Sequence, residues 1–122
     1  MASFRSHERI KTRAEFQQIY QQGTRLHGRY STVFVLANQR PIGRLGIAAT
    51  KKLGGAVERN RAKRLIREVF RRNKVAPGFD VVVIPKRELL QTSLIALETD
   101  YRNTLERTFR RIRSGSHAAK GV

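Results

Sequence analysis

The segment from Lys51 to Arg72 constrains the fold most, because it combines dense positive charge with the periodicity of a helix. Its apolar residues recur at the i, i+3, i+4, i+7 and i+8 spacing of a helix that buries one face. They are Ala62, Leu65, Ile66, Val69 and Phe70. A helix with such a stripe must pack against other elements, so this segment differs from a disordered basic tail.

The opposite side of the same helix is cationic. At about 100° per residue, four residues lie within about 60° of one another around the helix axis and form one line: Asn60, Arg64, Arg67 and Arg71. Arg61 and Lys63 flank this line, and between positions 51 and 74 ten basic residues meet only Glu58 and Glu68. A solvated helix face normally mixes signs so that charges pair at i, i+4. The excess favours a polyanionic partner, because guanidinium groups bind phosphate oxygens bidentately and the partner relieves the repulsion.

Composition limits the class of protein further. With 122 residues and 39% hydrophobic content, the chain predicts a single domain over residues 1–122. The net charge of +17 and the pI of about 11.7 favour a nucleic-acid binder. No apolar stretch approaches the roughly 18 residues of a membrane span, and the first residues lack the apolar centre of a signal peptide. The absence of cysteine excludes disulfides and thiolate zinc sites and fits the reducing cytoplasm, so we expect a cytoplasmic protein with no membrane or small-molecule partner.

The first half of the chain predicts one helix and two strands. Residues 1–10 lack periodicity and are expected to form a flexible arm. Thr12 and Glu15 have the spacing of a capping box, so a short helix follows to about Gln22 and ends at Gly23. Residues 25–38 favour a strand with Tyr30, Thr32, Phe34 and Leu36 on one face, residues 44–49 favour another, and the turn between them predicts a hairpin.

The second half alternates helix, strand and helix. After the basic helix, residues 80–85 form a continuous apolar run that is typical of a central strand covered on both sides. A last helix over residues 93–113 places an apolar stripe on its inner side, and residues 114–122 are expected to be a disordered tail. The predicted fold is α+β, a small mixed β-sheet with three helices in the order α-β-β-β-α-β-α, which has one strand more before the basic helix than the two segments named above.

Side-chain catalysis would need a nucleophile with its base, paired carboxylates or a metal cluster, and the sequence shows none. The three histidines, His7, His27 and His117, have no partner at metal-ligand spacing. Four carboxylates are either isolated or lie on a helix face among arginines and are attributed to surface ion pairs: Asp80, Glu98, Asp100 and Glu106. We therefore predict neither catalytic residues nor metal ligands in this chain.

The aromatic residues have two interpretations. Phe16 and Tyr20 lie one helical turn apart, and Tyr30 and Phe34 share a strand face. They can form core, or they can form a platform on which unpaired bases stack beside a cationic groove. Both arrangements have the same spacing, so periodicity leaves the choice open.

Three stretches in order carry a resemblance to a known family. They are Phe16-x-x-x-Tyr20-x-x-Gly23, then Gly46-Ile47-x-x-Thr50-Lys51-Lys52-x-Gly54-x-Ala56-Val57-x-Arg59-Asn60-Arg61-x-Lys63-Arg64-x-x-Arg67-Glu68, then Asp80-Val81-Val82-Val83. This succession resembles the protein subunit of bacterial ribonuclease P. The resemblance implies a left-handed βαβ crossover around the basic helix, against the usual right-handed preference. It also implies an accessory to a catalytic RNA that removes the 5′ leader of precursor tRNA with magnesium held mainly by the RNA.

The resemblance assigns three groups of residues. The face toward the catalytic RNA would comprise Arg59, Asn60, Arg61, Lys63, Arg64 and Arg67, and Arg71 continues it. The cleft for the single-stranded leader would comprise Phe16, Tyr20, Phe34, Lys51 and Lys52. Further phosphate contacts would come from Arg9, Lys11 and Arg13.

Two alternatives remain beside this reading. A structural RNA-binding protein, such as a ribosomal component, fits the charge, the size and the missing catalytic groups equally well. A protein-only nuclease would need clustered acidic metal ligands, and the scarcity of carboxylates argues against it.

Overall fold

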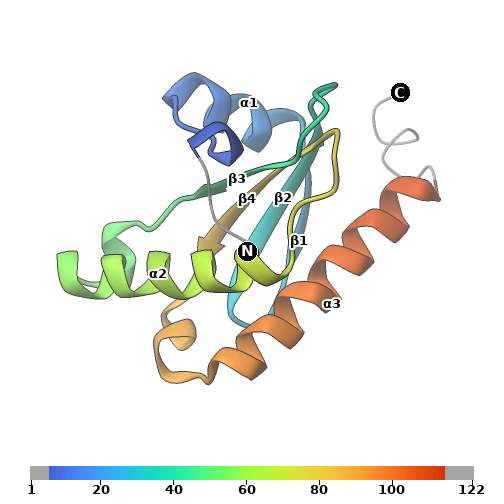
Figure 1. Ribbon diagram of the computed structural model, residues 1–122. Helices are drawn as coiled ribbons and strands as arrows, with labels where there is room; N and C mark the ends of the chain where they lie inside the picture. The colour runs from blue at the N-terminus through green and yellow to red at the C-terminus, as the bar shows by residue number, and fades with distance from the viewer. Residues whose placement is uncertain (1–5, 115–122) are drawn as a thin grey trace.

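The computed structural model describes residues 6–114, which form one sheet with helices on both faces (Figure 1). The principal elements are α1 (Arg13–Gln22), β1 (Thr24–His27), β2 (Ser31–Ala37), β3 (Arg44–Ile47), α2 (Ala56–Arg72), β4 (Phe79–Pro85) and α3 (Leu94–Arg113). Three short 3-10 helices are η1 (Ser6–Glu8), η2 (Lys51–Leu53) and η3 (Arg87–Gln91). The predicted α+β class and the order α-β-β-β-α-β-α are confirmed.

The sheet separates two apolar clusters. Alternate residues of the central strands point to opposite faces, so Val81 and Val83 pack under α2 and α3 whereas Val82 packs under α1. The stripe predicted for the basic helix is buried at Ala62, Ile66, Val69 and Phe70 and half-buried at Leu65. Helices therefore cover the two faces of the sheet unequally, with two on one side and one on the other.

The strand pairing differs from the predicted hairpin. The sheet order is β1-β2-β4-β3, so β4 lies between β2 and β3 and pairs antiparallel with the first and parallel with the second. The hairpin between residues 25–38 and 44–49 was a wrong prediction. The apolar run of β4 is buried on both faces and takes the central place, which local patterning of its neighbours could not reveal. A βαβ crossover is present, since α2 connects the adjacent parallel strands β3 and β4.

The segment predicted as one strand over residues 25–38 is in fact a hairpin, β1 and β2. The chain reverses at Gly28, whose N–H donates to the carbonyl of Ser31 at 2.8 Å. A Cβ at Gly28 would lie 2.5 Å from the Thr104 hydroxyl, so this close approach to α3 requires glycine. Tyr30 lies in the turn and packs on the α2–α3 side, whereas Phe34 and Leu36 face α1.

Residues 6–10, part of the segment expected to be a flexible arm, contact β3, although Ser6, His7 and Arg9 are exposed. The Ile10 N–H donates to the carbonyl of Leu45 at 3.0 Å, and Ile10 is buried in the cluster under α1. The segment thus lies alongside β3. The remainder of the expected arm, residues 1–5, and most of the expected tail, residues 115–122, lie outside the described residues.

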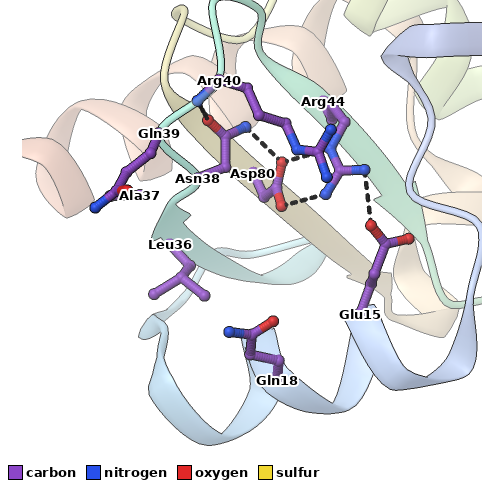
Figure 2. Close-up of a pocket in the computed structure, with 9 residues that line it drawn as sticks. All are labelled: Glu15, Gln18, Leu36, Ala37, Asn38, Gln39, Arg40, Arg44 and Asp80. Atoms are coloured by element: carbon purple, nitrogen blue, oxygen red, sulfur yellow. Dashed lines mark hydrogen bonds and ion pairs between the residues drawn. The ribbon is translucent and has the colours of Figure 1, made fainter.

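Two carboxylates attributed to surface ion pairs have other partners. Asp80 is buried and accepts hydrogen bonds from Arg44 and from the side chain of Asn38 (Figure 2). Asp100 accepts from the backbone N–H groups of Arg29 and Tyr30 and so holds the β1–β2 turn against α3. Both carboxylates therefore stabilise contacts inside the fold and are not explained by surface ion pairing.

Among residues 6–114, no helix has the length and apolar character needed to cross a membrane.

Candidate nucleic-acid interface

Helix α2 presents its cationic side to solvent because its apolar stripe is buried against the sheet. Four of the residues predicted to bind the catalytic RNA are exposed: Asn60, Arg61, Arg64 and Arg71. The other three, Arg59, Lys63 and Arg67, are half-buried. Arg59 donates to the carbonyl of Gly54 at 3.1 Å, so its guanidinium is held at the start of the helix. The charge of this face is therefore displayed on a rigid element.

Arg67 is the most constrained cation of this face. Its Nε is buried and has no hydrogen-bond partner among the described residues. Burial lowers the pKa of Arg67, and the positive charges of Arg9, Arg71 and Arg64 lower it further. A bound anion would accept the Nε hydrogen and offset the repulsion among these arginines.

A hollow of about 200 Å³ lies beside Arg67, between α2 and β3. It is lined by Arg9, Ile10, Phe16, Leu45, Ile47, Lys63 and Arg67. Three cations thus meet over an apolar floor. The structure brings together Arg9, predicted as a phosphate contact, with Lys63 and Arg67, predicted for the catalytic RNA.

A larger hollow of about 530 Å³ lies between α1 and the end of β3. It is lined by Lys11, Arg13, Phe16, Gln17, Tyr20, Ile47 and Ala48. The rings of Phe16 and Tyr20 are tilted by 49° with centroids 6.3 Å apart. Phe16 and Ile47 line both hollows. The larger hollow, which we call the aromatic cleft, therefore adjoins the cluster of Arg9, Lys63 and Arg67.

Phe34 lies beneath this cleft rather than along it. It is 7% exposed and packs with Ile19 and Val82, and its ring meets Tyr20 edge-on at 5.1 Å between centroids. Burial also raises the pKa of Tyr20. Of the three aromatic residues predicted for the leader, the structure places Phe16 and Tyr20 at the cleft and Phe34 in the core that supports them.

Lys51 and Lys52 form η2 and are exposed. They follow the cleft residue Ala48 along the chain and are not among the residues that line the hollow. Thr50 begins this turn, since its hydroxyl accepts from the Lys52 N–H at 3.3 Å. The structure therefore brings Lys11 and Arg13 to the cleft lining and leaves the two lysines outside it.

The cleft also contains residues that the sequence did not single out. Gln17 and Ala48 line it, together with Ile47. Gln17 follows Phe16 directly and precedes Tyr20 by three residues, so helical periodicity could have placed it on the same side. Ile47 is the last residue of β3 and Ala48 follows it, so their position depends on the pairing of β3 with β4, which the sequence did not reveal.

Residues 6–114 contain no group of three or more histidine, aspartate or glutamate side chains arranged to hold a metal ion. The buried carboxylate Asp80 is occupied by the Arg44 guanidinium, and Glu15 accepts from the same group. The fold and the site thus define a small α+β RNA-binding protein whose surface joins a rigid cationic helix to an aromatic cleft.

Comparison with known proteins identifies the family. Residues 4–109 match the family model described as Ribonuclease P. The chain is 43% identical over 89 residues to the ribonuclease P protein component of Thermotoga maritima, covering 71% of this chain and 76% of the relative. It is 31% identical over 102 residues to that of Clostridioides difficile, covering 81% and 90%.

Solved structures agree with this assignment. The RNase P protein from Thermotoga maritima superposes with a TM-score of 0.74 at 37% identity, over 82% of this chain and 96% of that one. The Staphylococcus aureus RNase P protein gives 0.72 at 34% identity, over 81% and 93%. The chain belongs to the ribonuclease P protein family, and its role is that of a subunit of this ribonucleoprotein endoribonuclease in tRNA 5′ processing.

Proposed function

We propose that the cationic face of α2 binds the catalytic RNA and that the aromatic cleft between α1 and β3 binds the single-stranded 5′ leader of precursor tRNA. The observation that carries this proposal is the shared border at Phe16, which joins the Arg9–Lys63–Arg67 cluster to the cleft. One face suits a regular array of phosphates and the other suits unpaired bases, and the two adjoin. A ribonucleoprotein in the cytoplasm that processes tRNA needs both surfaces at once.

The mechanism follows from electrostatics and stacking. Arginine side chains on α2 neutralise phosphates and release counterions, which reduces repulsion between the catalytic RNA and its substrate. Bases of the leader stack on Phe16 and Tyr20, while Lys11 and Arg13 contact its phosphates. Binding energy from the leader then favours the precursor over the mature tRNA, because only the precursor carries this segment.

Magnesium belongs to the RNA in this proposal. The donor set of the described residues does not fit a resident magnesium ion, since they contain no acidic cluster and Asp80 and Glu15 are both engaged by Arg44. The protein's contribution is to lower the repulsion that opposes close approach of two polyanions. No step of the cleavage is assigned to a side chain of this chain.

The test is cleavage of a precursor tRNA by a bacterial catalytic RNA at low magnesium and near-physiological salt. The reaction is run with the RNA alone, the protein alone, and both together. We expect efficient cutting at the mature 5′ end only in the combination. If the protein binds RNA but leaves cleavage unchanged, the alternative of a purely structural RNA-binding protein replaces this proposal.

A further inference from the structure

Helix α3 and the adjacent β1–β2 turn carry a second cationic surface, on residues that the proposed function does not use. This α3 surface consists of six exposed arginines, Arg29, Arg102, Arg107, Arg110, Arg111 and Arg113. Its apolar side is buried, with Leu97 and Tyr101 in the core. As in α2, a packed helix therefore presents its charge in a fixed arrangement.

The carboxylates of α3 do not neutralise this surface. Glu98 accepts from a side-chain amide of the loop after α2, and Asp100 accepts from two backbone N–H groups. Glu106 is the one exposed carboxylate of α3, and it pairs with Arg110 at 2.9 Å where both side chains are 65% exposed. Such an exposed pair contributes little, so the three carboxylates of α3 leave this surface with an excess of positive charge.

Two arginines of the α3 surface are oriented by the fold. The Nη2 of Arg107 donates to the carbonyl of His27 on β1 at 3.2 Å. The guanidinium of Arg29 lies 5.4 Å from the centre of the Tyr30 ring. A shallow hollow on α3 is lined by Arg107, Arg110, Arg111 and Ser114. Arg107 and Arg111 stand one helical turn apart, about 6 Å along the axis, which forms a short row of cations.

The position of this surface selects its partner. Helices α2 and α3 pack on the same face of the sheet, whereas α1 packs on the opposite face (Figure 1). An RNA that binds α2 can continue along the same side of the protein to α3. The leader, held beside α1, would have to pass around the sheet to reach it.

We propose that the α3 surface binds a second segment of the catalytic RNA through its phosphodiester backbone. This inference rests on the proposed function, which assigns α2 to the same RNA. A polyanion is favoured because it relieves the repulsion of six arginines, and planar guanidinium groups contact phosphate oxygens bidentately. Phosphate contacts carry no information about the base sequence, so the RNA segment is recognised by its backbone.

The test measures binding of the full chain to catalytic RNA as a function of salt. The double variant R107Q/R111Q removes two charges from the α3 surface, and R40Q/R87Q removes two exposed charges elsewhere as the matched control. Each contact contributes about 0.7 to 0.9 to the slope of log K against log salt, so we expect R107Q/R111Q to flatten it by about 1.4 to 1.8. Between 50 and 200 mM salt the unmodified protein then loses about sevenfold to twelvefold more affinity than the variant.

A variant that increases the positive charge of the α3 surface distinguishes lost RNA contacts from a folding defect. Glu106→Gln removes the exposed acid of the surface and is expected to tighten binding to catalytic RNA about twofold. Tighter binding with an unchanged melting temperature supports the proposal, and weaker binding overturns it. A slope for R107Q/R111Q equal to that of R40Q/R87Q also overturns it.

A second binding experiment, with precursor tRNA alone, decides which RNA the α3 surface binds. If R107Q/R111Q weakens binding to precursor tRNA and leaves catalytic RNA unchanged, the inferred partner is wrong. Arg64→Gln keeps this result separate from the proposed function. If Arg64→Gln has no effect while R107Q/R111Q does, the assignment of α2 fails and the α3 surface stands.

Discussion

Arg44 on β3 donates through Nη1 to the Oε2 of Glu15 on α1 at 2.8 Å. The Nε and Nη2 of the same guanidinium donate to the two carboxylate oxygens of Asp80 at 2.9 and 2.7 Å (Figure 2). Glu15 also completes the capping box of α1 with Thr12. One buried arginine therefore ties the start of α1, the helix that bears Phe16 and Tyr20, to the strand β4 at the centre of the sheet.

Replacing Arg44 by Met is expected to destabilise the protein strongly. It leaves Asp80 and Glu15 without their cation, and breaking a buried pair of this kind costs about 3–5 kcal/mol. Urea unfolding followed by circular dichroism measures the free energy of unfolding. Arg40 is exposed and lines the same pocket as Arg44 and Asp80 (Figure 2). Arg40→Met is therefore the control and should change the free energy of unfolding by less than about 0.5 kcal/mol. Equal effects of the two variants would contradict the role of Arg44.

Glu15 predicts an acid-dependent stability. Burial opposes its ionisation, but hydrogen bonds from Arg44 and Thr12 outweigh this and lower the pKa of Glu15 from 4.5 to about 2. A depressed pKa means that the unfolded state binds more protons, so stability is present above pH 4.5 and is lost as the pH falls toward 2. Urea midpoints at several pH values measure this loss. In Glu15→Gln the decline over this window should be shallower, and an unchanged decline would show that other carboxylates cause it.

Phe16→Leu should weaken the preference for precursor over mature tRNA. Leucine keeps most of the apolar volume but removes the aromatic face, and stacking of one base contributes about 1–3 kcal/mol. In the presence of catalytic RNA, we expect affinity for the precursor to fall about fivefold or more while affinity for mature tRNA changes little. Tyr20→Phe keeps the ring and serves as the control. Equal losses for both RNAs would show that Phe16 does not contact the leader.

Gly46→Ala tests the same cleft from β3, because Gly46 lies against the ring of Phe16. A Cβ at Gly46 would lie 2.8 Å from Cζ of Phe16, so the ring must shift. We expect the precursor preference to fall about as far as in Phe16→Leu, while binding to catalytic RNA alone keeps its affinity and its salt slope. A loss of catalytic-RNA affinity equal to the loss of precursor preference would instead indicate a general distortion of β3.

Arg67→Gln should weaken binding to catalytic RNA without destabilising the RNA-free protein. Its removal relieves the repulsion from Arg9, Arg64 and Arg71, so the free energy of unfolding of the RNA-free protein should not fall. The slope of catalytic-RNA binding against salt should flatten by about 0.7 to 0.9, as expected for one lost phosphate contact. Salt titrations and thermal unfolding measure the two effects. A large destabilisation without a change of slope would make Arg67 a structural residue.

Much of the fold was predictable where local pattern alone decides it. The capping box of α1, the buried stripe of α2 and the doubly covered strand β4 all follow from spacing within one segment. The cationic side of α2 followed for the same reason, because a helix that buries one face must expose the other.

The errors concern long-range contacts. The turn after β2 predicted a hairpin with β3, but β4 lies between them. Gly46 of β3 pairs with Val82 of β4, which is 36 positions further along the chain. Asp80 looked isolated because its partner Arg44 lies on that neighbouring strand. The contact of Ile10 with Leu45 of β3 is also long-range, and the flexible arm expected over residues 1–10 remains a prediction.

The sequence by itself determined the charge, the helices and their apolar stripes, because these depend on residues a few positions apart. The tertiary structure decided which strands pair and which side chains meet. It brings Arg9, from the start of the chain, to Lys63 and Arg67 of α2 in one hollow and makes Phe16 the border of that hollow with the aromatic cleft. It also buries Phe34 beneath Tyr20. Spacing along a strand or helix fixes which residues share a face, but only packing between elements decides whether that face meets a core or a partner.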